Sequence, residues 1–298
     1  MRLTLNQISN IPDDVSILRE LRELHVSSNR LLTLPTSIQA LAQLQVLDLS
    51  SNRLIEIPDF YSFPELRRVY LSFNRLTFLP SMVRQSALED LDIEGNQIST
   101  MPIMAKEHPH LRNLNVAGNR LGYIEGLSGC TSLASLNASG NRLEEVPPES
   151  VYATGLVSLV MAGNRIKRLS PSLFVWASLK TLDLSNNVID GIPPEVGFLT
   201  SMMNLNLSGN QITTLPNELI DCKKLTRADM EHNPLDLETA TVAATQNKLG
   251  KLCQLNGGLL RPARISKNHF EPDEQDQTID ESGGDQSVSN NDRSSLII

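Results

Sequence analysis

Basic residues, cysteine pairs, aromatic residues and long apolar runs are all scarce in this sequence of 298 residues. Asp and Glu (34) outnumber Lys and Arg (26), and the net charge of -8 argues against a surface that neutralises nucleic-acid phosphates. The three cysteines, Cys130, Cys222 and Cys253, are odd in number and far apart, so we expect no disulfide framework and a reducing compartment. No apolar stretch approaches the roughly 20 residues of a membrane helix, and no secretory signal follows Met1. We therefore expect a cytoplasmic protein without a membrane span.

Sequence motifs for catalysis are also missing. There is no Gly-rich loop ending in Lys-Ser/Thr, no His-Glu-x-x-His, no Cys-x-x-Cys and no Gly-x-Ser-x-Gly. His108 and His110 flank a proline, but no third or fourth metal ligand stands beside them, so we interpret both as residues of a solvated loop. The sequence thus predicts no catalytic residue, no metal, no cofactor and no enzymatic activity.

What the chain has in abundance is a repeat. Asparagines follow one another at steps of 22 or 23 residues, at positions 6, 29, 52, 74, 96, 119, 141, 164, 187, 210 and 233. Apolar residues stand three and five positions before each asparagine and two positions after it, and every asparagine except the last has another five positions after it; a proline usually follows. This is the pattern L-x-x-L-x-L-x-x-N-x-L-x-x-L-P, repeated eleven times with the first copy incomplete.

Each part of the repeat has a physical interpretation. The Leu-x-Leu segment predicts a short strand that buries alternate residues, and strands stacked one per repeat make a parallel sheet. No repeat can bury its apolar edge alone, so the chain must coil into a solenoid. The asparagine amide carries both a donor and an acceptor, and we expect it to join one turn to the next inside the coil.

The pattern resembles the leucine-rich repeat family over about residues 1–235. The resemblance implies an α/β solenoid with a curved parallel sheet on the concave side and helical or 3-10 turns on the convex side. The L-x-x-L-P ending looks like the intracellular Ras-group class, which includes scaffolds of small-GTPase and kinase signalling. We expect residues 236–258 to form a C-terminal capping helix with an apolar face at Leu237, Ala240, Ala244, Leu249 and Leu252, and residues 259–298 to form an acidic disordered tail. Because Met1 already lies in the first strand, either the native protein is longer or something else covers Leu3, Ile8 and Ile11.

Partner-binding residues are expected on the outward strand positions, which face the concave surface. The middle repeats have small or uncharged residues there, with Ser135 and Ser158 as examples, whereas the N-terminal third has aromatic and charged residues. The candidate partner-binding residues are Arg68, Tyr70, Phe73, Asp90, Asp92 and Glu94. A smaller cluster is Arg227, Asp229, Glu231 and His232. For both clusters the alternative is that surface charges pair across strands. Six of the repeat asparagines are followed by arginine, a row that we interpret as a solvated edge rather than a phosphate-binding strip.

These observations favour a non-enzymatic protein-protein interaction module, a cytoplasmic scaffold or adaptor that holds a protein partner on its concave face. A regulatory or targeting subunit, for example of a phosphatase, or a fragment of a longer enzyme is the main alternative. An extracellular recognition domain is a more distant one. The sequence leaves the oligomeric state and the partner open.

Overall fold

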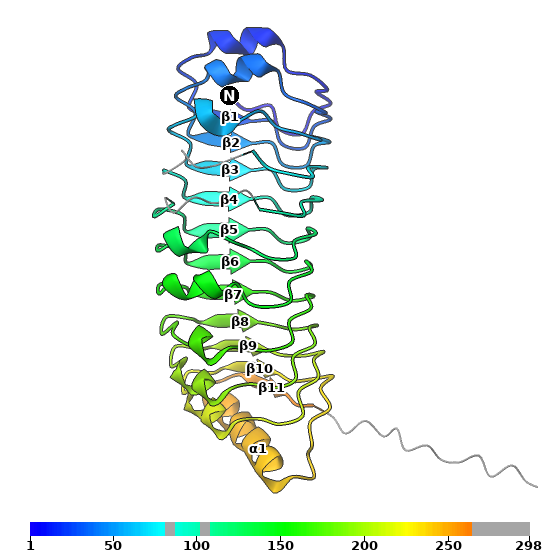
Figure 1. Ribbon diagram of the computed structural model, residues 1–298, viewed down its shortest axis with the longest axis vertical. Helices are drawn as coiled ribbons and strands as arrows, with labels where there is room; N and C mark the ends of the chain where they lie inside the picture. Colours follow the sequence, from blue (N-terminus) through cyan, green and yellow to red (C-terminus); the bar gives the residue numbers. More distant parts are fainter. Residues whose placement is uncertain (81–86, 102–107, 264–298) are drawn as a thin grey trace, which may run out of the picture. The chain divides into compact units, whose positions relative to one another are not determined.

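The computed structural model describes residues 1–80, 87–101 and 108–263. The expected acidic tail lies outside these residues, apart from its first few positions. The main unit, residues 1–265, is a stack of short strands in one parallel sheet of eleven, and each strand pairs with the next one in the sequence (Figure 1). The strands are β1 Glu23–His25, β2 Val46–Asp48, β3 Arg68–Tyr70, β4 Asp90–Asp92, β5 Asn113–Asn115, β6 Ser135–Asn137, β7 Ser158–Val160, β8 Thr181–Asp183, β9 Asn204–Asn206, β10 Arg227–Asp229 and β11 Leu259–Arg261.

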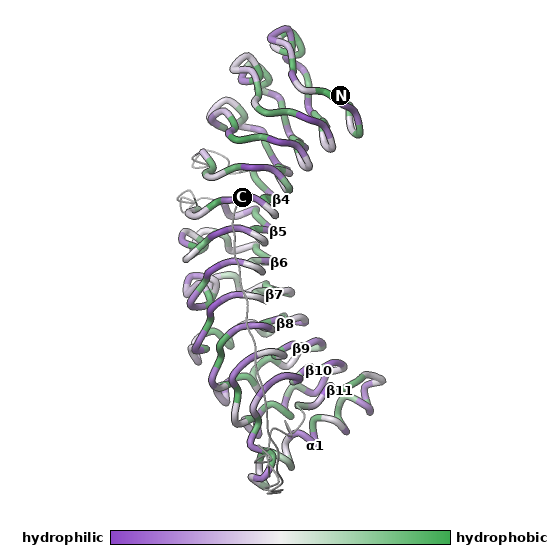
Figure 2. The backbone as a smooth tube through the Cα atoms, turned by 90° about the vertical axis from the view of Figure 1, so that its right-hand side faces the viewer, coloured by the Kyte–Doolittle hydropathy of each residue, from purple (hydrophilic) through white to green (hydrophobic). Residues whose placement is uncertain are grey.

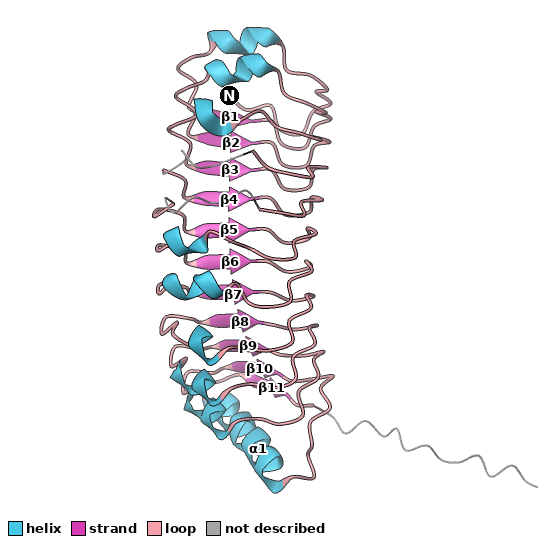
Figure 3. Cartoon of the chain, in the orientation of Figure 1, coloured by secondary structure: helices cyan, strands magenta, loops and turns pink. Residues whose placement is uncertain are grey.

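The strands line the inner side of a bend, and short 3-10 helices gather on one side of the stack (Figures 2 and 3). The 3-10 helices of the described residues are η1 Asp13–Ile17, η2 Thr36–Ala40, η3 Phe60–Ser62, η4 Leu127–Gly129, η5 Pro148–Tyr152, η6 Pro171–Leu173, η7 Pro194–Phe198 and η8 Asn217–Asp221. This is the α/β solenoid that the repeat predicts: the middle residue of each strand from β1 to β10 is buried, as in Leu24, Val69 and Leu159, and its two neighbours belong to the concave face.

The repeat asparagines form a ladder inside the coil. The amide nitrogen of Asn119 lies 2.9 Å from the carbonyl oxygen of Ile93 in the preceding repeat and 3.1 Å from those of Val116 and Ala117. Its Oδ1 accepts a hydrogen bond of 3.0 Å from the backbone N–H of Ile98. The equivalent contacts recur from Asn29 to Asn233, and these asparagines are all buried. The predicted structural role of the asparagines is therefore confirmed.

The ends of the solenoid differ from its middle. At the N-terminus, Leu3 donates its N–H to the carbonyl of His25 at 2.7 Å, so the first repeat adds a single parallel bridge beside β1. Ile11 is buried, and Leu3 and Ile8 pack against the core while half-buried. Asn6 is exposed and bonds only to carbonyls of its own repeat.

At the C-terminal end, the helix α1, Ala240–Leu255, lies inside the segment expected to form a cap. Its buried residues are Val242, Thr245, Leu249 and Cys253, and Leu252 is half-buried against the core. The expected apolar face is therefore confirmed at Leu249 and Leu252 and wrong at Ala240 and Ala244, which are exposed. Alanine contributes little apolar area, and the hydroxyl of Thr245 donates to Oδ1 of Asn217 at 2.7 Å, which holds the other face inward.

The chain then makes one more strand where the sequence predicted only tail. β11 pairs in parallel with β10, with Leu260 opposite Ala228. Gly258 makes this return possible, because a Cβ at this position would lie 1.8 Å from the carbonyl oxygen of Thr226. The asparagine period could not reveal this strand, since no asparagine follows it at the repeat spacing.

His108 also departs from the expected loop position. Its side chain is fully buried, whereas His110 is exposed. His108 stands three residues before Leu111, a place taken in other repeats by core residues such as Leu41 and Trp176. Among the described residues, no group of three His, Cys, Asp or Glu side chains is arranged to hold a metal ion.

The ladder makes stability depend on position. Replacing Asn119 by Ala leaves the N–H of Ile98 without its partner and removes one of the two amide hydrogen bonds to the carbonyl of Ile93, which should lower the free energy of unfolding by about 1–3 kcal/mol. Asn247 is exposed on α1, and its replacement by Ala is the matched control, expected to change little. Urea unfolding of both variants measures this, and equal losses would contradict the structural role.

The cap depends on one glycine. Gly258→Ala should lower the free energy of unfolding by at least about 2 kcal/mol, because the new methyl group would collide with backbone that cannot move freely. Gly155→Ala is the control, since nothing lies within 4 Å of a Cβ there. Thermal unfolding of the two variants compares them, and a Gly258→Ala protein as stable as the parent would show that β11 does not return against β10 as described.

Candidate functional site on the concave face

The outward residues of the strands form two columns that run along the concave face. The third residue of each strand belongs to one column, in which Asp48, Tyr70, Asp92 and Asn115 are neighbours. Most members of this column are Asp or Asn, and their Oδ1 accepts the backbone N–H two residues later, as Asp92 does from Glu94 at 3.1 Å. The same bond is made by Asp48, Asn115, Asn137, Asp183, Asn206 and Asp229. These side chains therefore shape the turn that follows each strand.

Tyr70 departs from this structural role. It has no oxygen in the position that accepts the turn N–H, and it stands between Asp48 and Asp92, which do. Tyr70 is half-buried and lines an open hollow of about 390 Å³ with Asp90, Asp92 and residues of β5 and β6. Burial raises the pKa of its phenol, and the carboxylate of Asp90 raises it further, so Tyr70 presents a neutral hydroxyl.

The acidic residues of the candidate site bond to the next repeat instead of to a cation. Oδ1 of Asp90 accepts a hydrogen bond from the amide of Asn113 at 2.5 Å, and Oε2 of Glu94 accepts one from Asn115 at 2.9 Å. Arg68 lies opposite Asp90 in the sheet register. Within the described residues, however, no ion pair includes Arg68, Asp90, Asp92 or Glu94. The alternative in which these charges pair with one another across strands is not met at this site, and both signs of charge stay available.

Phe73 does not join this hollow. It follows β3 in the turn before Asn74, where φ is +56°, and its ring lies against Gly95 of the next repeat. Every equivalent position in the described repeats has a positive φ, and most hold Gly, Ser or Asn. Sequence reasoning grouped Phe73 with Tyr70 because both are aromatic, but the turn carries Phe73 to the edge where the strands end.

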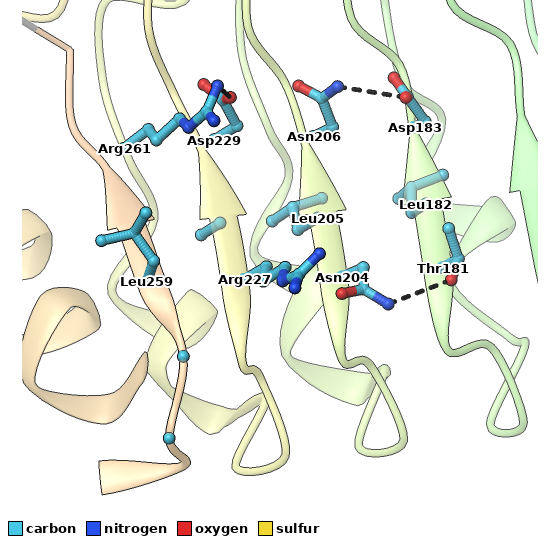
Figure 4. Close-up of a pocket in the computed structure, with 13 residues that line it drawn as sticks. Thr181, Leu182, Asp183, Asn204, Leu205, Asn206, Arg227, Asp229, Leu259 and Arg261 are labelled. Carbon is cyan, nitrogen blue, oxygen red and sulfur yellow. Dashed lines mark hydrogen bonds and ion pairs between the residues drawn. The ribbon is translucent and has the colours of Figure 1, made fainter. Parts of the chain in front are cut away.

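A second and larger hollow lies at the C-terminal end of the concave face, with a volume of about 700 Å³ (Figure 4). Arg227 and Asp229 of the smaller predicted cluster line it, whereas Glu231 and His232 do not. Asp229 forms an ion pair of 3.5 Å with Arg261, and no ion pair of the described residues includes Arg227. Sequence reasoning missed Arg261 and Leu259 because β11 lacks the repeat asparagine; the short segment Leu-Leu-Arg after two glycines was the available signal.

The cysteines do not contribute to either hollow. Cys130, Cys222 and Cys253 are free and buried. Burial raises the pKa of the Cys130 thiol and of the Cys222 thiol to about 11, so neither is a ready nucleophile at neutral pH. No helix in the described part of the chain combines the length and the apolar character that crossing a bilayer requires.

Comparisons with known proteins agree with this geometry. A leucine rich repeat model matches residues 1–54, 64–121 and 154–198, a two-copy model matches residues 42–82, and a single-repeat model matches residues 201–222. The chain belongs to the leucine-rich repeat family. No curated protein sequence matches it.

Solved structures with the same fold come from different settings. A leucine-rich repeat protein of Leptospira interrogans is 28% identical over 83% of this chain and 69% of its own, with a TM-score of 0.68. The plant peptide hormone receptor RGFR1, solved in complex with RGF2, is 30% identical over 77% of this chain and 39% of its own, with a TM-score of 0.71. YopM from Yersinia enterocolitica is 26% identical over 79% of this chain and 47% of its own, with a TM-score of 0.63. The chain thus spans between 39% and 69% of these three proteins.

The raised pKa of Asp92 gives a test of its structural role. Burial raises this pKa above the ordinary 3.8, and the hydrogen bond from the N–H of Glu94 only partly offsets the effect. A carboxyl whose pKa is raised on folding contributes stability below its unfolded pKa and loses it as the pH rises through the folded value. Asn makes the same turn at position 115, so Asp92→Asn should be more stable than the parent at pH 7 and equally stable near about pH 3.

Denaturant titrations of both proteins across this pH range give the comparison. Asp90→Asn removes a carboxylate from the same strand and is a control, because no backbone N–H of the following turn donates to Asp90 among the hydrogen bonds of the described residues. A stability difference between Asp92→Asn and the parent that does not change with pH would contradict the raised pKa of Asp92.

Proposed function

We propose that the protein is a non-enzymatic binding module that holds a protein partner on its concave face, around Arg68, Tyr70, Asp90, Asp92 and Glu94. The observation that carries this proposal is Tyr70, a half-buried aromatic residue in a column otherwise filled mostly by turn-forming Asp and Asn. Interface energy usually concentrates in a few aromatic and arginine anchors. The unpaired charges around Tyr70 supply orientation and a faster encounter with a partner of complementary charge.

Two further features support the concave face as the binding surface. RGFR1 has the same fold and was solved with the peptide RGF2, so a neighbour in structure binds a peptide ligand. Ser135 lines the first hollow and Ser158 lies between the two hollows, and these small side chains would let a partner approach the sheet closely. A partner long enough to reach both hollows would cover β3 to β10.

We propose that the protein acts in the cytoplasm as a scaffold or adaptor of the Ras-group kind, in small-GTPase or kinase signalling. The L-x-x-L-P repeat endings and the buried free cysteines support it. The two Asn-x-Ser sequences, the pattern that is N-glycosylated in secreted proteins, also support it. Asn137 and Asn206 lie in strands, and their Oδ1 atoms accept hydrogen bonds from the following turns. A regulatory or targeting subunit would use the same surface, and the identity of the partner distinguishes these two roles.

Tyr70→Asn tests the proposal with little risk to the fold, because Asn occupies the same column in β5 and β6. Affinity purification with mass spectrometry identifies a partner, and titration calorimetry then measures its affinity. We expect Tyr70→Asn to weaken binding by about 2 kcal/mol or more. The control variant Ser158→Ala, at a position that lines neither hollow, should bind as the parent does.

An unchanged affinity of Tyr70→Asn would overturn the assignment of this site. Arg227→Ala then becomes informative, because a loss confined to that variant would place the partner at the C-terminal hollow.

A further inference from the structure

The repeats at the N-terminal end carry an unusual surface on the edge where the strands end. Leu32, Ile55, Phe73 and Phe78 each have between 51% and 57% of their surface exposed. Strand arrows in Figure 1 point toward this edge, and Figure 2 views it directly. We call these four residues, together with Arg30, Arg53 and Arg75, the N-terminal edge surface. Leu32 and Ile55 are neighbours across two repeats, because the N–H of Ile55 donates to the carbonyl of Leu32, and neighbouring exposed apolar residues mark interaction sites in folded proteins.

Backbone hydrogen bonds hold the edge surface together across repeats. The N–H of Ile55 donates to the carbonyl of Leu32 at 3.3 Å, and the N–H of Arg53 donates to the carbonyl of Leu31 at 2.9 Å. The N–H of Arg75 donates to the carbonyl of Leu54 at 2.9 Å. Equivalent side chains of successive repeats therefore follow one another at roughly the 4.8 Å spacing of neighbouring strands.

The fold does not require apolar side chains here. Leu32 and Ile55 stand three residues after the ladder asparagine, and later repeats have polar residues or glycine at that place: Thr77, Ser99, Gly122, Glu144, Lys167, Asp190 and Thr213. Phe73 is a bulky residue with a positive φ, a conformation that favours Gly or Asn, and the repeats on either side have Ser51 and Gly95 there. Leu32, Ile55 and Phe73 are thus costly or unnecessary for folding.

The arginines give the edge surface its charge. Arg30, Arg53 and Arg75 are exposed, and none of them takes part in an ion pair of the described residues. Glu56, next to Ile55, is exposed as well, so the edge surface keeps a surplus of positive charge. The same column continues with Arg120, Arg142 and Arg165, but there Glu144 and Lys167 replace the apolar neighbours. Of the described repeats, only those at the N-terminal end combine exposed arginines with exposed apolar residues three positions after the ladder asparagine.

We propose that the N-terminal edge surface docks an amphipathic α-helix of a partner protein, with one acidic side chain per helical turn beside apolar ones. A helix laid along the solenoid axis presents a side chain about every 5.4 Å, close to the spacing of about 4.8 Å between arginines. An extended segment presents same-side residues about every 6.6 Å and falls out of step after two repeats. The edge surface is a second contact area, independent of the concave hollows.

The experiment uses the full chain and a synthetic probe. The probe is a capped helical peptide of about 18 residues, or five turns, with Glu at three successive turns of one face and Leu or Phe beside them. Two comparison peptides have the same composition in shuffled order, or Lys in place of Glu. Fluorescence anisotropy measures binding to the parent and to variants.

We expect the parent to bind the Glu peptide and not the shuffled one. The triple variant Arg30→Glu, Arg53→Glu, Arg75→Glu should bind it at least about tenfold more weakly and should instead prefer the Lys peptide. The matched triple variant Arg120→Glu, Arg142→Glu, Arg165→Glu changes the same column where apolar neighbours are absent, and should bind the Glu peptide within about twofold of the parent. Leu32→Thr with Ile55→Thr and Phe73→Ser, which installs residues that other repeats have, should also lose binding.

Other outcomes overturn the proposal. Equal losses in the two arginine triple variants would show a nonspecific charge effect, and equal binding of the shuffled peptide would show that helical spacing is irrelevant. No measurable binding of the Glu peptide, or binding only to vesicles containing anionic lipid, would exclude a helix as the occupant. Tyr70→Asn should leave peptide binding unchanged, so failure here and failure of the concave site are separately visible.

Discussion

Hydrogen bonding between successive asparagines and the repeats before them is the constraint on which the rest of the structure depends. Each buried ladder asparagine bridges to a carbonyl of the preceding repeat and accepts an N–H from it, as Asn164 does with Ala138 and Leu143. The turn that leaves each strand would otherwise place these backbone groups in the core without partners, at a cost of about 1–3 kcal/mol for each group. The ladder thus fixes both the direction of the turn and the register of the next strand.

Fixed register converts a repeating sequence into continuous surfaces. Since equivalent residues lie one above another, a side chain that departs from its column stands out by position alone. Asp92 belongs to its column because its carboxylate bonds the following turn, whereas Tyr70 at the equivalent place serves no such role. Phe73 departs in the same way from a column of small residues with positive φ. The residues most available for binding are those that the repeat does not explain.

The asparagine period was sufficient to predict the solenoid, the parallel sheet and the buried ladder, because each follows from spacing and from the bonding capacity of an amide. It could not predict β11, which lacks the asparagine and depends on the tight approach of Gly258 to Thr226. The candidate site was predicted in part. Tyr70, Asp90 and Asp92 do line one hollow, but the separation of Phe73 follows from a turn conformation that the letters of the sequence do not show. Arg261 was missed for the same reason as β11.

Native-state hydrogen exchange tests the central role of the ladder most directly. The backbone N–H groups of Leu54, Leu121 and Ile189 lie beyond the strands and donate to Oδ1 of the asparagine in the next repeat. The account predicts that these amides exchange as slowly as those of the central strand residues, because they open only when neighbouring repeats separate. Exchange of these amides at the rate of exposed loop amides, while the strand amides stay protected, would contradict it.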